Sequence, residues 1–356
     1  MTVSGAYVTT VLGPVSADEL GVTLMHEHLL FSLAAYWSPP ADLPTPEIAT
    51  APLSLETLWW VRQHPAGSRP NLTQDDPLLA AKELARFKAA GGGTLVEVSS
   101  HGLNRDVRGL REIAWRTGVN VVAGTGYYIG ASHPPELAGR SVDDLADDMV
   151  RDLDEGVEGT DIRAGVIGEI GTSEPLAPTE ALVLRAAARA QRRTGAAMVM
   201  HPAPQDRSAE AMGRWLALLE DEGATPGRVV ISHCEERLRD APDDFARLAE
   251  RGYVLSLDTW GNVNHYESRG FTMPCDAERI ALLARLVADG LAPSLVLAQD
   301  ICFAHALTAF GGHGYAHLLQ NLRPRLHAAG ISRAALRTMF VDNPRRILAR
   351  DANVIA

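Results

Sequence analysis

The chain has 356 residues, of which 46% are hydrophobic and 22% charged, and its formal net charge at pH 7 is −11. This is the composition of a folded chain with a large core, and the acidic balance argues against binding to nucleic-acid backbones or anionic membranes. Three cysteines without CxxC spacing exclude a disulfide framework, and no signal-peptide pattern or membrane-length apolar run is present. We therefore expect a cytoplasmic protein that acts on a small molecule.

Predicted strands and helices alternate along most of the chain. Residues 4–20 predict a short hairpin, residues 21–25 begin the first strand, and a proline-rich excursion covers 36–73. Seven more strands are predicted at 94–98, 119–123, 165–169, 197–201, 229–233, 253–258 and 295–300. Helices are predicted at 75–90, 106–117, 141–155, 179–194, 209–222, 243–251, 277–289, 316–329, 333–339 and after Pro344.

Eight strands separated by helices favour a barrel, because right-handed βα units repeated eight times close on themselves. An open doubly wound sheet is the alternative, but the glycine-rich phosphate turn that usually follows its first strand is missing. The sequence therefore predicts an α/β fold, a (β/α)8 TIM barrel forming a single domain over residues 1–356. We expect the excursion to lie near the barrel mouth.

A pair of histidines ends the first predicted strand. In His26-Glu27-His28, residues two apart on a strand point to the same side, so the imidazoles converge and Glu27 turns away. Later strands also end in metal-binding residue types, and the carboxyl ends of barrel strands meet at one face. The sequence therefore predicts one metal centre made of His26, His28, Glu169, His201, His233 and Asp300.

Four imidazoles and two carboxylates exceed the needs of one tetrahedral zinc and suit two divalent ions about 3.5–4 Å apart. We assign His26, His28 and Asp300 to one ion, His201 and His233 to the other, and Glu169 to the bridge. Two such ions would make a bridging hydroxide available at neutral pH, and Asp300 would act as the catalytic acid and base. Zinc is favoured, while manganese, cobalt and iron suit the same ligands.

Three residues of the loops that follow the later strands are candidates for substrate contact. Asp258 and Trp260 follow the seventh strand, although Asp258 could instead cap a turn. His313 lies in Gly311-Gly-His-Gly-Tyr315, which could close over a substrate or form a rigid turn.

The order of ligands resembles that of the phosphotriesterase family of the amidohydrolase superfamily. The motifs that match are Val11-Leu-Gly-Pro-Val, Leu24-Met-His-Glu-His-Leu29, Gly124-Thr-Gly-Tyr-Tyr128, Gly165-Val-Ile-Gly-Glu-Ile-Gly171, Gln299-Asp-Ile301 and Asp342-Asn-Pro344. The resemblance covers almost the whole chain and is strongest to the branch of phosphotriesterase-related proteins. It implies a metal-dependent hydrolase, often dimeric, in which Tyr128 is a pocket residue.

One departure bears on the substrate. Phosphotriesterases resemble this chain except at position 169, where they carry a carboxylated lysine and this chain has glutamate. The related branch shares the glutamate, and its animal members are associated with N-acyl amides such as N-acetyltaurine, while other relatives open lactones. The resemblance therefore favours cleavage of a carboxylic amide, ester or lactone. Phosphotriester or phosphoester hydrolysis is the alternative, and a non-catalytic, metal-containing small-molecule binding protein is the alternative from another class.

Overall fold

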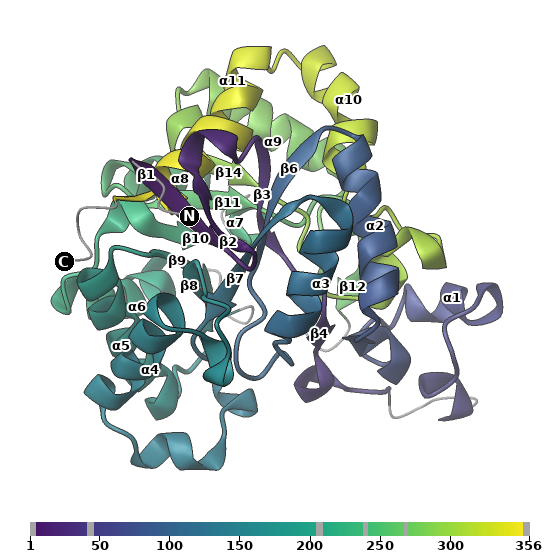
Figure 1. Ribbon diagram of the computed structural model, residues 1–356. Coiled ribbons are helices and arrows are strands. Elements are labelled where there is room, and N and C mark those ends of the chain that lie inside the picture. Colours follow the sequence, from purple (N-terminus) through teal and green to yellow (C-terminus); the bar gives the residue numbers. More distant parts are fainter. Residues whose placement is uncertain (1–4, 41–45, 204–208, 238–240, 267–269, 352–356) are drawn as a thin grey trace.

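The computed structural model describes residues 5–40, 46–203, 209–237, 241–266 and 270–351. Its centre is a sheet of eight parallel strands in which neighbours pair in chain order (Figure 1). The strands are β3 (Val22–Glu27), β6 (Gly92–Glu97), β7 (Asn120–Thr125), β8 (Val166–Gly171), β9 (Ala197–His201), β10 (Val229–Ile231), β11 (Val254–Leu257) and β14 (Leu295–Leu297). The first and last strands meet where the Asp300 N–H donates to the His26 carbonyl at 3.2 Å. The predicted (β/α)8 barrel is thus confirmed, and the open sheet is wrong.

Helices surround the strands on the outside of the barrel (Figure 1). They are α2 (Pro77–Ala89), α3 (Val107–Thr117), α4 (Val142–Asp154), α5 (Pro178–Thr194), α6 (Ala209–Asp221), α8 (Pro242–Glu250), α9 (Asp276–Ala288), α10 (Arg323–Ala328), α11 (Arg333–Arg337) and α12 (Asn343–Leu348). A capping box opens α4, because Ser141 Oγ accepts from the Asp144 N–H and the Asp144 carboxylate accepts from the Ser141 N–H, both at 3.1 Å. Gly118 ends α3 in the left-handed conformation that glycine tolerates.

Side chains of each strand alternate between the barrel interior and the helix layer. On β9, Val199 packs with inward residues of other strands, such as Val230 and Val254, whereas Met198 and Met200 pack against the helices. The same parity makes His201 face inward at the end of β9. The alternation that builds the core therefore also aims His201 into the barrel mouth.

The N-terminal end of the barrel is closed by the predicted hairpin. Strands β1 (Ala6–Thr10) and β2 (Gly13–Ser16) pair antiparallel, and β15 (Arg350–Asp351) joins them. Val8 and Ile347, from opposite ends of the chain, pack against the inward valines. Residue 4 of the predicted hairpin lies outside the described residues.

A two-stranded ribbon joins the two ends of the excursion, in which β4 (Phe31–Ser32), just before it, pairs with β5 (Thr73–Gln74) at its end. The excursion carries α1 (Leu55–Val61), where Trp60 is buried and Trp59 is 65% exposed. Neither tryptophan lines the cavities described below, so packing explains Trp60. Residues 41–45 of the predicted excursion lie outside the described part of the chain.

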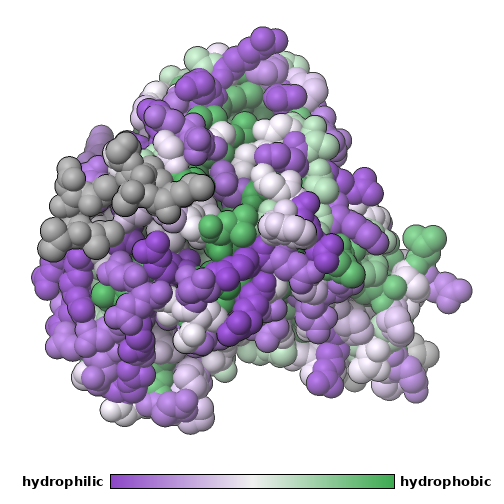
Figure 2. Space-filling model, viewed as in Figure 1, coloured by the Kyte–Doolittle hydropathy of each residue, from purple (hydrophilic) through white to green (hydrophobic). Residues whose placement is uncertain are grey.

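The outer surface is mostly hydrophilic on the face shown in Figure 2, as expected for helices whose apolar sides face the strands. Among the described helices, none combines the length and hydropathy needed to cross a bilayer.

Candidate metal centre

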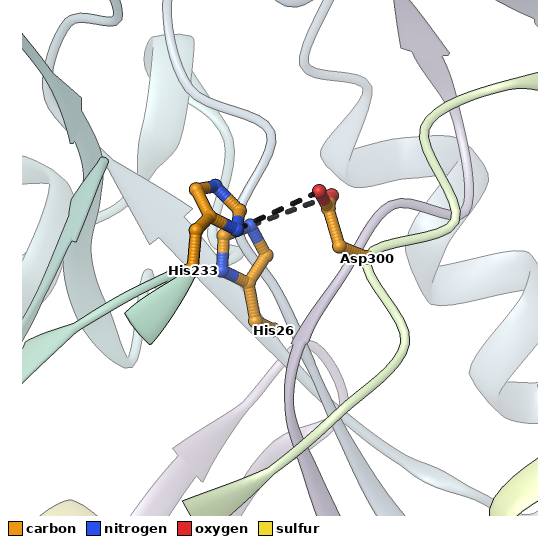
Figure 3. Close-up of side chains that lie close together, drawn as sticks. All are labelled: His26, His233 and Asp300. Carbon is orange, nitrogen blue, oxygen red and sulfur yellow. Dashed lines mark ion pairs between the residues drawn. The ribbon is translucent and has the colours of Figure 1, made fainter. Parts of the chain in front are cut away.

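The structure brings together all six predicted ligands at the C-terminal end of the barrel. Three overlapping sets each place their potential ligand atoms within 4.8 Å of one another. Figure 3 shows one set, in which the side chains of His26, His233 and Asp300 point toward a common centre. The other sets are His26, His28 and Glu169, and Glu169, His201 and His233.

The two histidines of the first strand converge as predicted. The Nε2 atoms of His26 and His28 lie 3.6 and 3.3 Å from Asp300 Oδ1. They lie 3.5 and 3.3 Å from the two carboxylate oxygens of Glu169. The register in which β3 pairs with β6 shifts between Leu24 and Glu27. The strand is therefore irregular at the position of these two histidines.

Glu169 also faces the remaining histidines. Its Oε2 lies 2.7 Å from His201 Nδ1, which in turn is 2.9 Å from His233 Nε2. One carboxylate oxygen therefore faces His28 and the other faces His201, which is the arrangement required of a bridging carboxylate.

Two of the six residues have a left-handed backbone. The φ angle is 57° at His233 and 48° at Asp300. Such angles are uncommon for residues other than glycine and persist where surrounding structure enforces them. On β10 the inward parity of Val230 continues to Ser232, so an ordinary strand residue at position 233 would face outward. The left-handed turn instead aims His233 into the mouth.

Hydrogen bonds fix which nitrogen each histidine presents to the centre. Asp258 accepts from His233 Nδ1 at 2.8 Å and from His26 Nδ1 at 3.1 Å. Ser99 Oγ contacts His28 Nδ1 at 2.9 Å and donates to Glu97 at 2.7 Å. His26 and His28 therefore present Nε2, as metal-bound histidines do when a carboxylate or hydroxyl holds their other nitrogen. His233 turns Nε2 toward His201, while its Nδ1 lies 3.9 Å from Asp300 Oδ2.

Other carboxylates anchor the backbone around the ligands. Glu27 accepts from the N–H groups of Gln299 and Ile301 at 2.6 and 3.1 Å, and so fixes the backbone on both sides of Asp300. Glu235 accepts from the N–H of Thr259 at 2.7 Å, next to Asp258. Glu27 can make these contacts because its side chain turns away from the two histidines, as the sequence predicts.

The carboxylates of the centre stabilise positive charge close to them. Burial disfavours the imidazolium form of His28, but Asp300 and Glu169 outweigh it and raise its pKa to about 10. Burial similarly opposes ionisation of Glu169, but His201 and His26 lower the pKa of this carboxyl well below its usual value. The carboxylates thus attract cations to this position.

The residues present fit a pair of divalent ions. His26 Nε2 is buried and has no hydrogen-bond partner among the described residues, although it lies at the centre of the cluster. A buried polar atom without a partner is costly unless a ligand satisfies it. Imidazole nitrogens and carboxylate oxygens are donors that divalent cations accept, so this cluster is able to hold a metal ion.

A cavity of about 100 Å³ opens onto the centre. Its walls include Leu33, Tyr36, Tyr128 and Phe303, which belong to an apolar cluster above the ligands. Tyr128 OH lies 3.3 Å from His201 Nε2 and accepts from Tyr36 OH at 3.1 Å. The position of Tyr128 therefore agrees with that of a pocket residue.

The three other substrate candidates are placed differently. Asp258 and Trp260 are fully buried and line neither cavity, so their interpretation as substrate contacts is corrected. Asp258 faces inward beneath the histidines because it continues the inward parity of Val254, and the Trp260 Nε1–H donates to the Leu257 carbonyl at 3.0 Å within the core. His313 lines a second, adjoining cavity instead of the one with the ligands.

The sequence interpretation missed the hydroxyls that hold the ligands. Ser99 and Ser232 each lie next to a strand end, and Ser232 Oγ is 2.8 Å from His26 Nδ1. For Ser232 the available signal was its inward parity, which it shares with Val230 on β10. Ser99 has the parity of Leu95, which packs against the helices, so strand periodicity gave no such signal for it.

The fold and the site together define a (β/α)8-barrel protein with a histidine and carboxylate centre at the barrel mouth. The phosphotriesterase family matches this chain over residues 6–348. The chain is 38% identical over 347 residues to an N-acetyltaurine hydrolase of Tetraodon nigroviridis, covering 96% of this chain and 97% of that protein. The chain belongs to the phosphotriesterase family and is a hydrolase.

Solved structures of similar proteins agree with this assignment. A resiniferatoxin-binding protein from Rhodobacter sphaeroides is 39% identical, with a TM-score of 0.91, over 98% of this chain and 96% of that chain. A mutant of a phosphotriesterase-like lactonase from Deinococcus radiodurans is 27% identical, with a TM-score of 0.74, over 96% of this chain and 99% of that chain.

Proposed function

We propose that this protein is a binuclear metal-dependent hydrolase of carboxylic amides, esters or lactones, with short N-acyl amino acids or N-acyltaurine-like amides as its preferred substrates. The observation that carries this proposal is the convergence of four imidazoles and two carboxylates on one cavity. Zinc is the proposed metal, and we place the reaction in the cytoplasm.

The bound ions would supply an activated water and polarise the carbonyl of the substrate. Glu169 would hold both ions, since its two oxygens face different histidines. Asp300 would accept the proton of the attacking water and transfer it to the departing nitrogen or oxygen. The acyl–nitrogen bond breaks as the new carbon–oxygen bond forms, so the products of an amide are a carboxylate and an amine.

The dimensions of the cavity support a short acyl group. Its volume of about 100 Å³ and its apolar walls suit a small alkyl chain better than a long one. The similarity to N-acetyltaurine hydrolases supports an amide, and the similarity to a lactonase supports a cyclic ester.

The experiment uses protein reconstituted with zinc and a panel of N-acyl amino acids, N-acetyltaurine, lactones and a chromogenic phosphotriester. We expect turnover of at least one carbonyl substrate, its loss after chelation and its recovery when zinc is restored. Protein with two bound ions that cleaves only the phosphotriester, or nothing in the panel, would contradict the proposal.

A further inference from the structure

A second cavity adjoins the metal centre on the side of Asp300. Its volume is about 340 Å³, and it shares Asp300, Asn262 and Phe303 with the cavity described above. The walls of this second cavity are mixed in polarity, and the polar residues among them are Arg62, Asn262, Asn264, Gln299, His305 and His313. The two cavities differ in degree: polar groups make up a larger share of the lining of the larger cavity, whereas an apolar cluster forms part of the walls of the smaller one beside the proposed ligands.

Arg62 gives the second cavity its positive charge. Among the described residues that line either cavity, it is the only arginine or lysine, and it forms no ion pair within the described part of the chain. Its Nη2 donates to the Gly311 carbonyl at 3.2 Å, which ties the end of α1 to the loop after β14. Burial and the charge of Arg62 lower the pKa of His305 to about 4. The charge of Arg62 therefore acts on another residue that lines the same cavity.

The opposite wall is neutral and rigid. Burial and nearby cationic groups lower the pKa of His313 to about 3, and its buried Nε2 has no hydrogen-bond partner among the described residues. An added Cβ at Gly261 would lie 2.6 Å from the His313 ring, and one at Gly312 would lie 2.1 Å from the Ala306 backbone. The loop that carries His313 is therefore packed in place, which favours the rigid turn over a closing loop.

The position of Asp300 and the character of the walls decide which part of the substrate enters this cavity. Because Asp300 would give its proton to the departing nitrogen, the amine part must leave on the side of Asp300. Asp300 lines both cavities, so the character of the walls has to assign the two parts of the substrate. The smaller cavity has the more apolar walls and suits the acyl chain, and the larger one contains Arg62. The amine part therefore extends toward Arg62.

We infer that the second cavity is a subsite for a carboxylate or sulfonate carried by the amine part of the substrate, and that Arg62 pairs with this acidic group. This inference rests on the proposed amide hydrolysis, and it assigns a specificity role to a residue outside the metal centre. A guanidinium offers two parallel N–H donors to a carboxylate or sulfonate, which fixes the orientation of the bound group.

The test compares N-acetyl-β-alanine with N-acetyl-β-alaninamide, which differ only in the charge of the terminal group, and adds N-acetyltaurine as the sulfonate. In Arg62→Gln we expect kcat/KM for the two acidic substrates to fall about 10-fold or more, mainly through KM, because a hydrogen bond to a charged group is lost. The neutral amide should change less than about twofold on the same reasoning. Arg62→Lys should recover part of the loss. Added salt should weaken the preference of the wild type for acidic substrates but have little effect on Arg62→Gln.

The matched control is Arg69→Gln. Arg69 belongs to the same excursion, and its guanidinium lies over the Trp37 ring at 5.5 Å without lining either cavity. It should leave the preference for acidic substrates unchanged. An equal loss for charged and neutral amides in Arg62→Gln, or no loss, overturns the subsite while amide hydrolysis stands. Failure of the zinc-loaded wild type to cleave any of the three amides overturns the subsite. The proposed function falls with it only if the lactones and the other N-acyl amino acids are not cleaved either.

Discussion

Asp258 offers a direct test of how the metal centre is held, because one carboxylate contacts two proposed ligands. Its Oδ1 accepts from both the backbone N–H and the Nδ1 of His233 at 2.8 Å, and its Oδ2 lies 3.1 Å from His26 Nδ1. Asp258→Asn keeps the shape of the side chain but replaces one acceptor oxygen with an N–H donor. In either orientation of the amide, one imidazole N–H then faces another donor, which disfavours the ring orientation that presents Nε2.

The expected magnitude follows from the number of ligands affected. Loss of one such supporting contact typically costs 10–100-fold in metal affinity, or about 1.4–2.7 kcal/mol. Because Asp258 supports histidines assigned to different ions, we expect a loss near the upper end, about 100-fold, with both ions affected. Competition with a chromophoric chelator measures the affinities, and metal analysis gives the number of ions bound.

The matched control is Asp276→Asn. Asp276 also accepts from a histidine, with its Oδ2 2.8 Å from His317 Nε2, but neither residue belongs to the metal centre. The Asp276→Asn variant should bind both ions as the wild type does. If Asp258→Asn retained both ions with affinities within about twofold of the wild type, the supporting role derived from these hydrogen bonds would be refuted.

Three further predictions address catalysis, the bridge and the second cavity. In Asp300→Asn, turnover should fall by about 10²-fold or more because the amide cannot relay the proton, with an unchanged melting curve as evidence of folding; near-normal turnover would count against the role of Asp300. Zinc-reconstituted wild type should show the same activity with and without added bicarbonate, because Glu169 is already a carboxylate; a requirement for bicarbonate would be incompatible with this bridge. Gly261→Ala should lower the free energy of unfolding by about 2–3 kcal/mol, because φ at Gly261 is +87° and the added Cβ would lie 2.6 Å from the His313 ring. A melting temperature equal to that of the wild type would show that the loop adjusts without cost.

Much of the fold could be predicted from the sequence because its signals are local. Alternating apolar runs and helix caps, such as Ser141 before α4 and Gly118 after α3, located the elements to within a few residues. Their order then restricted the topology to a barrel, since repeated βα units have one preferred hand. The six proposed ligands also carried a local signal, because each lies at the end of an apolar run.

The roles of the residues between these ligands were decided by the tertiary structure. Asp258 and Asp300 both follow apolar strands and have the same chemistry, so the sequence could not distinguish a residue beneath the histidines from one facing the cavity. The difference arises from backbone geometry, because Asp258 directly follows β11 with inward parity, whereas Asp300 adopts a φ of 48° beyond the end of β14. Likewise, Arg62 and His313 are 251 positions apart in the sequence, and only the packing of α1 and the β14 loop around one cavity places them together. Strand periodicity is a property of neighbouring residues, whereas a cavity is formed by segments that meet only in the folded chain.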